Sequence, residues 1–363
     1  MEFVFSDEQS ELRSMARGFL RDTSPEAQVR RLMETPEGFD ASVWAQLAEL
    51  GLTGLGIPER YGGAGRGAVE VGIVMEEAGA ALLCAPYLST VVLATETLLA
   101  AGDEAALKTY LPGIAEGTLR ATLATDGALK ARQVSGEWLL DGTADRVLDG
   151  LSAGMVLAVA GTPEGHRLFA VDTGAAGVSR TALATMDATR KQAALTLTRT
   201  PARPVGEAGL PDRILGHVLA VASTCLAAEQ VGGAQRTLDM AVGYAKLRVQ
   251  FGRPIGSFQA IKHKCADLFL RVEAARSAAY HALWSAAEGS PEFAAAAHIA
   301  GAYCSEAYYH CAEENILIHG GIGYTWEHPA HLYFKRAAAD RVLFGDPDHH
   351  RAALADGIPM TMA

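Results

Sequence analysis

The most informative stretch of the sequence is Arg248-Val249-Gln250-Phe251-Gly252-Arg253-Pro254-Ile255-Gly256-Ser257-Phe258-Gln259. It lies between two long helical patterns, and its proline and glycines interrupt the helix. An arginine, an aromatic ring and a glutamine keep fixed positions around the interruption. A loop that binds an anionic, aromatic ligand needs such groups, whereas a tight inter-helix turn does not. From residue types alone, a ligand-binding loop and a plain turn both remain open.

The composition is typical of a globular cytoplasmic protein. Hydrophobic residues make up 49% of the 363 residues and charged residues 20%, which argues against a disordered chain. A chain of this length can form two or three compact units. The net charge of −11 argues against a nucleic-acid-binding surface, but it leaves room for local phosphate sites.

Several other classes of protein are not expected. The opening residues Met1–Glu8 lack a basic segment followed by an apolar one, so we expect no secretory signal. No apolar run reaches the length of a membrane span. The 5 cysteines are scattered without a Cys-x-x-Cys pair, and the 11 histidines form no clear metal-binding pair beside a carboxylate. We therefore expect reduced thiols and no metal.

The first segment, to about residue 119, is predicted to be helical. Ser6-Asp7-Glu8-Gln9 is a capping box that opens a helix to about Arg21. Ser24-Pro25-Glu26 starts a second helix, and Asp40 caps a third that ends at Gly51. Further helices are expected at 68–79, at 89–101 and from 103 to about 111.

The middle segment, about 120–207, has a different periodicity. It contains four short β-prone runs bounded by Gly, Asp or Pro, which predict an antiparallel barrel or sandwich. These runs are Glu137–Gly142, Met155–Val159, Arg167–Val171 and Ala194–Thr198.

The last segment, 208–363, contains three long helical patterns. They are broken at the opening stretch, at Gly289-Ser290-Pro291 and at His319-Gly320-Gly321. Antiparallel helices with short connections favour a four-helix bundle. The expected fold is therefore α+β and mainly α, with an N-terminal helical domain (1–119), a small β-domain (120–207) and a C-terminal bundle (208–363).

Four blocks of sequence are specific enough to compare with known families. They are Phe5-Ser6-Asp7-Glu8-Gln9 with Leu12 and Phe19; Trp44–Gly51 followed by Ile57-Pro58-Glu59-Arg60-Tyr61-Gly62-Gly63; Arg248-x-x-Phe251-Gly252-x-x-Ile255-x-x-x-Gln259; and His319-Gly320-Gly321-Ile322-Gly323-Tyr324. In this order they resemble the acyl-CoA dehydrogenases along nearly the whole chain.

The resemblance implies an FAD site between the β-domain and the bundle, completed by a neighbouring subunit. Arg248 would pair with the FAD diphosphate, because a guanidinium matches phosphate oxygens bidentately. Phe251 would pack on the flavin or adenine, and Gln259 would hydrogen-bond nearby. Gln250 is counted with them as a cofactor-binding residue. The alternative for Phe251 is a core aromatic.

The C-terminal glycine motif is similar to a loop of the family that lies against the cofactor. Gly320, Gly321 and Gly323 would let the backbone approach FAD without a Cβ in the way. The alternative is that these glycines end a helix.

The reaction that the resemblance implies is α,β-desaturation of an acyl-CoA thioester. A carboxylate removes the α-proton while the flavin N5 accepts hydride from the β-carbon. A desolvated carboxylate with a raised pKa suits the weakly acidic α-carbon. The electrons would pass to an electron-transfer flavoprotein or a similar acceptor.

The sequence departs from the family where the catalytic base is expected. When the chain is aligned on Lys335-Arg336, the usual glutamate position holds Gly345, and the other family position holds Val249. Asp346 is one residue further on and is the candidate base if the loop shifts. Alternatively, Asp346 caps a turn.

The β-domain departs as well. The family motif Thr-Glu-Pro-x-x-Gly-Ser-Asp is reduced to Thr125-Asp126-Gly127, which leaves Thr125 as the candidate flavin contact. The segment Gly142–Asp149 lacks the tryptophan and threonine that usually face the flavin.

These losses suggest how the chain works within an assembly. Because the family builds each FAD site from two subunits, one chain can keep only its contribution to the neighbour. The stretches His319–His328 and Phe344–Pro347 are similar to actinobacterial members that act on steroid side-chain thioesters as α2β2 assemblies. We expect a homo-oligomer or a heterotetramer with a second dehydrogenase-like subunit. The alternatives are a catalytically incomplete partner subunit and a flavin oxidase or monooxygenase of the same fold.

Overall fold

The structure is a computed structural model that describes residues 5–357. The first four residues, on which the secretory-signal expectation partly rests, lie outside this range. Contacts between residues divide the chain into two compact units. The barrel unit comprises Arg30–Gly67 and Cys84–Ala222, and the bundle unit comprises the residues up to Val29, Ala68–Leu83 and those from Ser223 onward. Each unit is described by itself.

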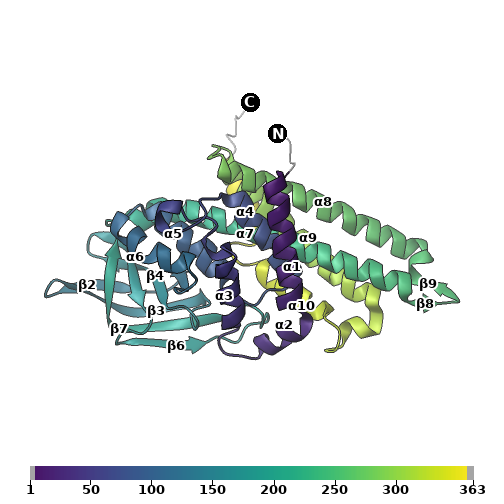
Figure 1. The fold of residues 1–363 in the computed structure, drawn as a ribbon, viewed down its shortest axis with the longest axis horizontal. Coiled ribbons are helices and arrows are strands. Elements are labelled where there is room, and N and C mark those ends of the chain that lie inside the picture. The colour runs from purple at the N-terminus through teal and green to yellow at the C-terminus, as the bar shows by residue number, and fades with distance from the viewer. Residues whose placement is uncertain (1–4, 358–363) are drawn as a thin grey trace. The chain divides into compact units, whose positions relative to one another are not determined.

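The bundle unit is helical and is assembled from three separate parts of the chain. Long helices dominate it, with one small hairpin between the two longest (Figure 1). Its elements are α1 (Asp7–Thr23), the start of α2 (Glu26–Met33), α4 (Ala68–Ala80), most of α7 (Leu210–Leu247), β8 (Val249–Gln250), β9 (Arg253–Pro254), η4 (Ile255–Ser257), α8 (Gln259–Ala287), α9 (Phe293–His319), η5 (Gly320–Tyr324), α10 (Ala330–Asp340) and α11 (Pro347–Gly357).

The predicted helix starts are confirmed by their cap geometry. The Ser6 hydroxyl accepts the Gln9 N–H at 3.2 Å, and the Gln9 side chain accepts the Ser6 N–H at 3.0 Å, which forms the expected capping box. Asp40 accepts the Ser42 N–H at 2.9 Å at the start of α3 (Ala41–Glu49). Local side-chain chemistry therefore sets these boundaries.

Helices of the barrel unit precede and flank its strands. They are α3, η1 (Leu52–Gly54), η2 (Glu59–Tyr61), the π-helical η3 (Leu88–Ala94), α5 (Thr95–Ala101) and α6 (Glu104–Ala115). The expected end of α6 near Pro112 is wrong, because the helix continues to Ala115. Leu111 and Ile114 are fully buried on either side of the proline. Their burial holds the helix together across the lost backbone hydrogen bond.

The strands of the barrel unit close into a barrel. They are β1 (Ala121–Ala124), β2 (Lys130–Val134), β3 (Glu137–Leu148), β4 (Met155–Thr162), β5 (Gly165–Asp172), β6 (Val178–Ala182) and β7 (Gln192–Val205). The ring runs β4–β2–β3–β7–β5 and returns to β4, while β6 pairs with β7 and β1 with β4. Inward side chains such as Leu140 and Phe169 form its core.

The sequence predicts a purely antiparallel β-domain, and the structure differs from this prediction in two strand pairs. β1 runs parallel to β4, with Ala121 opposite Met155, and β2 meets β4 through one parallel pair. The hairpin β2–β3 lies between β1 and β4 in sequence, so the chain crosses over before it returns. Periodicity within a short strand carries no information about such a crossover.

The helix α7 is an exception to the expectation that no apolar run reaches membrane-spanning length. An 18-residue window of α7 has a mean hydropathy of 1.5, and 61% of that window is buried within the structure. Core helices of soluble proteins have the same length and composition, so α7 is weak evidence for a membrane span.

Candidate functional site

The stretch from Arg248 to Gln259 is a hairpin that links α7 to α8. Val249 pairs with Pro254 and Gln250 with Arg253, and the Arg248 carbonyl accepts the Ile255 N–H at 2.7 Å. The tip residue Phe251 has a φ of 52°. A left-handed phenylalanine is strained, and such strain is concentrated at binding sites.

Phe251 does not belong to a core within its unit. It is 89% exposed, and its ring makes an edge contact with Phe258 at 6.1 Å between ring centroids. The Arg253 guanidinium lies 4.2 Å from the Phe258 ring centroid and supports that ring from the hairpin. Arg248, Gln250 and Gln259 are exposed as well. The hairpin therefore presents a cation, an aromatic ring and amides to solvent.

The glycine motif ends α9 and turns the chain. Gly320 has a φ of 64°, and its N–H donates to the carbonyls of Ile316 and Leu317 as a helix C-cap. A Cβ on Gly323 would lie 2.6 Å from the Ile316 carbonyl oxygen, so Gly323 is required for packing. A Cβ on Gly320 or Gly321 would meet open space. Backbone accessible to a ligand is thus found at Gly320 and Gly321.

The hairpin and the glycine motif lie at the same end of the bundle. The ring of Tyr244, in the last turn of α7, stacks on His319 with 4.3 Å between centroids, and His319 lies 4.2 Å from His328. Burial lowers the pKa of His319, so its imidazole is neutral near pH 7. Sequence analysis singled out neither Tyr244 nor His328 as a site residue. The only available signal was that His319 and His328 flank the glycine motif.

We call the hairpin 248–259 together with the loop 319–328 the bundle end. Two further aromatic side chains are exposed there, Tyr324 and Trp326, at 69% and 58%. The Lys335 ammonium lies 4.4 Å from the Trp326 ring centroid. Exposed aromatic rings among cations are typical of a surface that another chain or an anionic aromatic ligand covers.

Asp346 lies elsewhere in the bundle unit and caps a helix. Its carboxylate accepts the His349 N–H at 2.7 Å, and its carbonyl accepts the His350 N–H at 3.1 Å at the start of α11. His350 in turn packs beside Gly301 of α9. The 18 residues from Gly301 to His319 span about 27 Å of helix. The structure therefore does not bring Asp346 to the bundle end.

Thr125 belongs to the barrel unit, where it is exposed directly after β1. The next residue, Asp126, pairs with Arg146 at 2.7 Å, and Arg146 has a φ of 54°. Arg146 lies in the segment that usually provides a tryptophan. An exposed ion pair thus stands in the part of β3 where the sequence lacks the tryptophan usual in the family.

The residues of the bundle end fit one part of FAD. An exposed guanidinium suits a diphosphate, an exposed phenyl ring suits a stacked ring system, and open glycine backbone permits close approach. In the described part of the barrel unit, no aromatic side chain occupies the 142–149 segment. The chain therefore fits the diphosphate and adenine half of the cofactor better than the flavin ring.

Comparison with known proteins agrees with these features. The model of the acyl-CoA dehydrogenase N-terminal domain matches residues 6–118, and that of the C-terminal domain matches residues 213–358. The chain is 37% identical to the acyl-CoA dehydrogenase IpdE2 of Mycobacterium tuberculosis over 343 residues, which cover 94% of each protein.

Two solved structures are similar along almost their whole length. One is the Tcur3481-Tcur3483 steroid ACAD G363A variant, with a TM-score of 0.85 and 32% identity over 96% of this chain and 97% of that one. The other is the ChsE4-ChsE5 complex from Mycobacterium tuberculosis, with a TM-score of 0.90 and 28% identity over 100% of both chains. On these matches, this chain belongs to the acyl-CoA dehydrogenase family.

Proposed function

We propose that this chain is one subunit of a heteromeric acyl-CoA dehydrogenase and that its bundle end completes an FAD site held mainly by the partner subunit. The family consists of FAD-dependent oxidoreductases, so the cofactor and the reaction class follow from membership. The observation that carries the proposal is the bundle end itself, where a strained, 89% exposed phenylalanine stands beside an exposed arginine.

The relatives support an assembly of two kinds of chain. One similar structure is named as a complex of ChsE4 with ChsE5, and another pairs Tcur3481 with Tcur3483 as a steroid ACAD. By analogy we propose that the substrate is an acyl-CoA thioester and that its acyl group is a steroid side chain. An electron-transfer flavoprotein or a similar protein would accept the electrons, in the cytoplasm.

Each residue of the bundle end has a proposed task. Bound FAD supplies the hydride acceptor for the β-carbon of the thioester. Arg248 binds the diphosphate, and Phe251 covers a ring of the cofactor and excludes water from it. Gln250 and Gln259 donate side-chain hydrogen bonds nearby, and Gly320 and Gly321 let the cofactor approach the backbone without a Cβ in the way. In the alternative hypothesis, this chain has its own active site, and Asp346 abstracts the α-proton there.

Co-expression with a second dehydrogenase-like chain of the same organism tests the proposal. We expect a yellow complex that reduces an artificial acceptor with an acyl-CoA, and a colourless chain when it is expressed alone. In the complex, Arg248→Ala removes a charge-assisted phosphate contact worth about 1.5–3 kcal/mol, which lowers FAD affinity about 10- to 150-fold. Arg132→Ala, an exposed arginine of the barrel unit paired with Asp141, is the matched control.

Two results would contradict the proposal. One is a yellow, active enzyme from this chain alone. The other is a complex of Arg248→Ala that keeps its flavin content through dilution and gel filtration. For the second result, the variant complex must also form and keep a normal secondary structure, checked by circular dichroism.

A further inference from the structure

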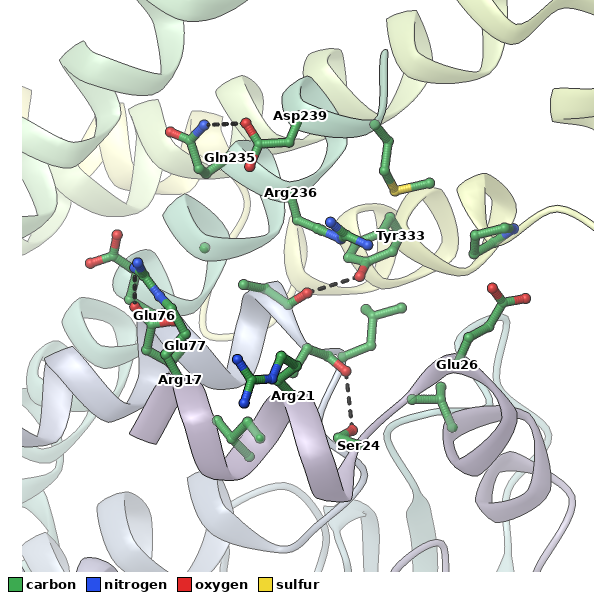
Figure 2. A pocket seen from close by; sticks show the side chains of 18 of the residues that line it. Arg17, Arg21, Ser24, Glu26, Glu76, Glu77, Gln235, Arg236, Asp239 and Tyr333 are labelled. Atoms are coloured by element: carbon green, nitrogen blue, oxygen red, sulfur yellow. Dashed lines mark hydrogen bonds and ion pairs between the residues drawn. The ribbon is translucent and has the colours of Figure 1, made fainter. Parts of the chain in front are cut away.

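A separate cavity of about 730 Å³ lies wholly within the bundle unit. Its walls come from α1, the start of α2, the end of α4, the middle of α7, α8 at Arg276 and the start of α10 (Figure 2). Ligand sites for small organic molecules have volumes of about 300–1,000 Å³. The cavity is therefore large enough for a ligand of that size.

Two buried carboxylates line the cavity, and both accept hydrogen bonds from neighbouring side chains. Glu76 accepts hydrogen bonds from Arg13, Arg276 and Tyr280, and Glu77 accepts two from Arg17 at 2.8 and 2.9 Å. These ion pairs fasten α1 and α8 to α4. They account for three of the cavity's arginines as structural residues.

The other two arginines differ from these three. Arg21 projects from α1 and Arg236 from α7, on either side of the cavity in Figure 2. The Arg21 side chain is 75% exposed and pairs with its neighbour Asp22 at 3.0 Å. Arg236 lies within hydrogen-bonding reach of the Tyr333 hydroxyl, which itself donates to the Ala80 carbonyl at 2.8 Å. Among residues 5–357, no carboxylate forms an ion pair with Arg236.

Part of the lining is apolar. It includes Leu20, Val29, Met240, Pro329 and Leu332, next to the Tyr333 ring. Five arginines and four carboxylates line the cavity, and Asp22 outside the lining pairs with Arg21. Arg236 is therefore the arginine of the lining that pairs with no carboxylate of residues 5–357. A single positive charge beside an apolar wall matches a monoanion with an apolar body and disfavours a polyphosphate.

We propose that this cavity binds an amphipathic carboxylate, with its head group on Arg21 and Arg236 and its apolar body against Leu332, Met240 and Tyr333. The guanidinium groups bind the carboxylate oxygens by charge-assisted hydrogen bonds. The site belongs to this chain alone and involves neither FAD nor the thioester. Its ligand class is that of fatty acids and other apolar organic acids.

Calorimetric titration of the purified complex with dodecanoate tests the proposal. We expect saturable binding of one molecule per copy of this chain, and no saturable binding of dodecanol or dodecylamine at the same concentrations. Arg236→Gln and Arg21→Gln should each weaken dodecanoate binding about tenfold or more, because each removes a charged partner of the head group. Arg132→Gln, in the barrel unit, should bind as the wild type does.

Three outcomes would overturn the proposal. Equal binding of dodecanol would show that only apolar surface is involved. Unchanged binding in the two arginine variants, each with a wild-type unfolding transition, would place the ligand elsewhere. Binding to the isolated chain that disappears in the complex would show that a subunit covers the cavity. None of these outcomes depends on flavin content, so failure here is separate from failure of the proposed function.

Discussion

Among single residues, Asp346 has two possible roles, a structural one as a helix cap and a catalytic one as the base. Its carboxylate accepts the His349 N–H at 2.7 Å and so performs the ordinary task of an N-cap. The same residue is the candidate base of the sequence analysis. A cap needs a side-chain oxygen acceptor, whereas a base needs a titratable carboxylate.

We predict that Asp346→Asn keeps both stability and turnover of the complex near the wild-type values, because asparagine caps a helix as well as aspartate does. Asp346→Ala should lower the free energy of unfolding by about 1 kcal/mol. Urea unfolding and steady-state turnover measure the two effects. A fall in kcat of about 10²-fold or more in Asp346→Asn, at unchanged stability, would instead assign proton abstraction to Asp346.

Candidate site residues could be singled out from the sequence where a motif fixes their positions. Arg248 and Phe251 stand out because an arginine and an aromatic flank a helix break at set offsets. Tyr244 and His328 were not predictable, since they meet His319 only through packing of α7 against the end of α9. The sequence also could not distinguish the glycines from one another. In the structure Gly323 packs on Ile316, whereas Gly321 faces open space.

At the scale of elements, α7 and α10 are joined by a buried ion pair. Arg336 donates to Glu229 at 2.5 Å, and their side chains are 3% and 4% exposed. Removing one partner leaves the other charge buried without its counter-ion, whereas replacing both with apolar residues of similar volume does not.

We predict that Arg336→Ala lowers the free energy of unfolding by about 3–5 kcal/mol. The double variant Glu229→Leu with Arg336→Met should stay within about 2 kcal/mol of the wild type. Chemical unfolding of the bundle unit, followed by circular dichroism, measures both. If the double variant is as unstable as Arg336→Ala, the ion pair stabilises the fold by more than the free energy that burying its two charges costs.

The contact between α9 and α11 contains a cluster of imidazoles. The Nδ1 atoms of His298 and His350 lie 3.0 Å apart, and the His349 ring is close to both. Burial, followed by the neighbouring His298 and His349, lowers the pKa of His350 to about 4, and Asp346 opposes this shift. Burial also lowers the pKa of His298.

A depressed pKa in the folded state makes stability depend on pH. An unfolded histidine takes up its proton near pH 6.5, whereas folded His350 stays neutral down to about pH 4. The free energy of unfolding is therefore unaffected by His350 above pH 6.5. It decreases by roughly 2–3 kcal/mol as the pH falls from 6.5 to 4, because the unfolded state takes up the proton first. Urea unfolding at a series of pH values should show a flatter profile for His350→Asn, while His166→Asn, exposed on β5, should follow the wild type. Parallel profiles for all three proteins would disprove the assignment.

At the scale of the whole molecule, the order of elements was predictable from the sequence. Helices to Ala115, strands from Ala121 to Val205 and helices from Leu210 follow the change from helical to alternating periodicity. The four predicted strands are present and longer than expected, since the polar, outward positions of β3 and β7 carry no hydrophobic signal. The parallel pairing of β1 with β4, and the assembly of the bundle unit from three parts of the chain, depend on contacts distant in sequence.

The three-part bundle unit also has a consequence for the order of synthesis. Arg13 of α1 meets Glu76 of α4 early, but its contact with Tyr280 must wait for a residue 267 positions later. At translation rates of about 5–20 residues per second, that wait lasts on the order of tens of seconds. During this time α1 and α4 expose the faces that α7 and α8 later cover. The nascent chain therefore carries an unfinished apolar surface until its last third emerges, which makes it a natural substrate for chaperones.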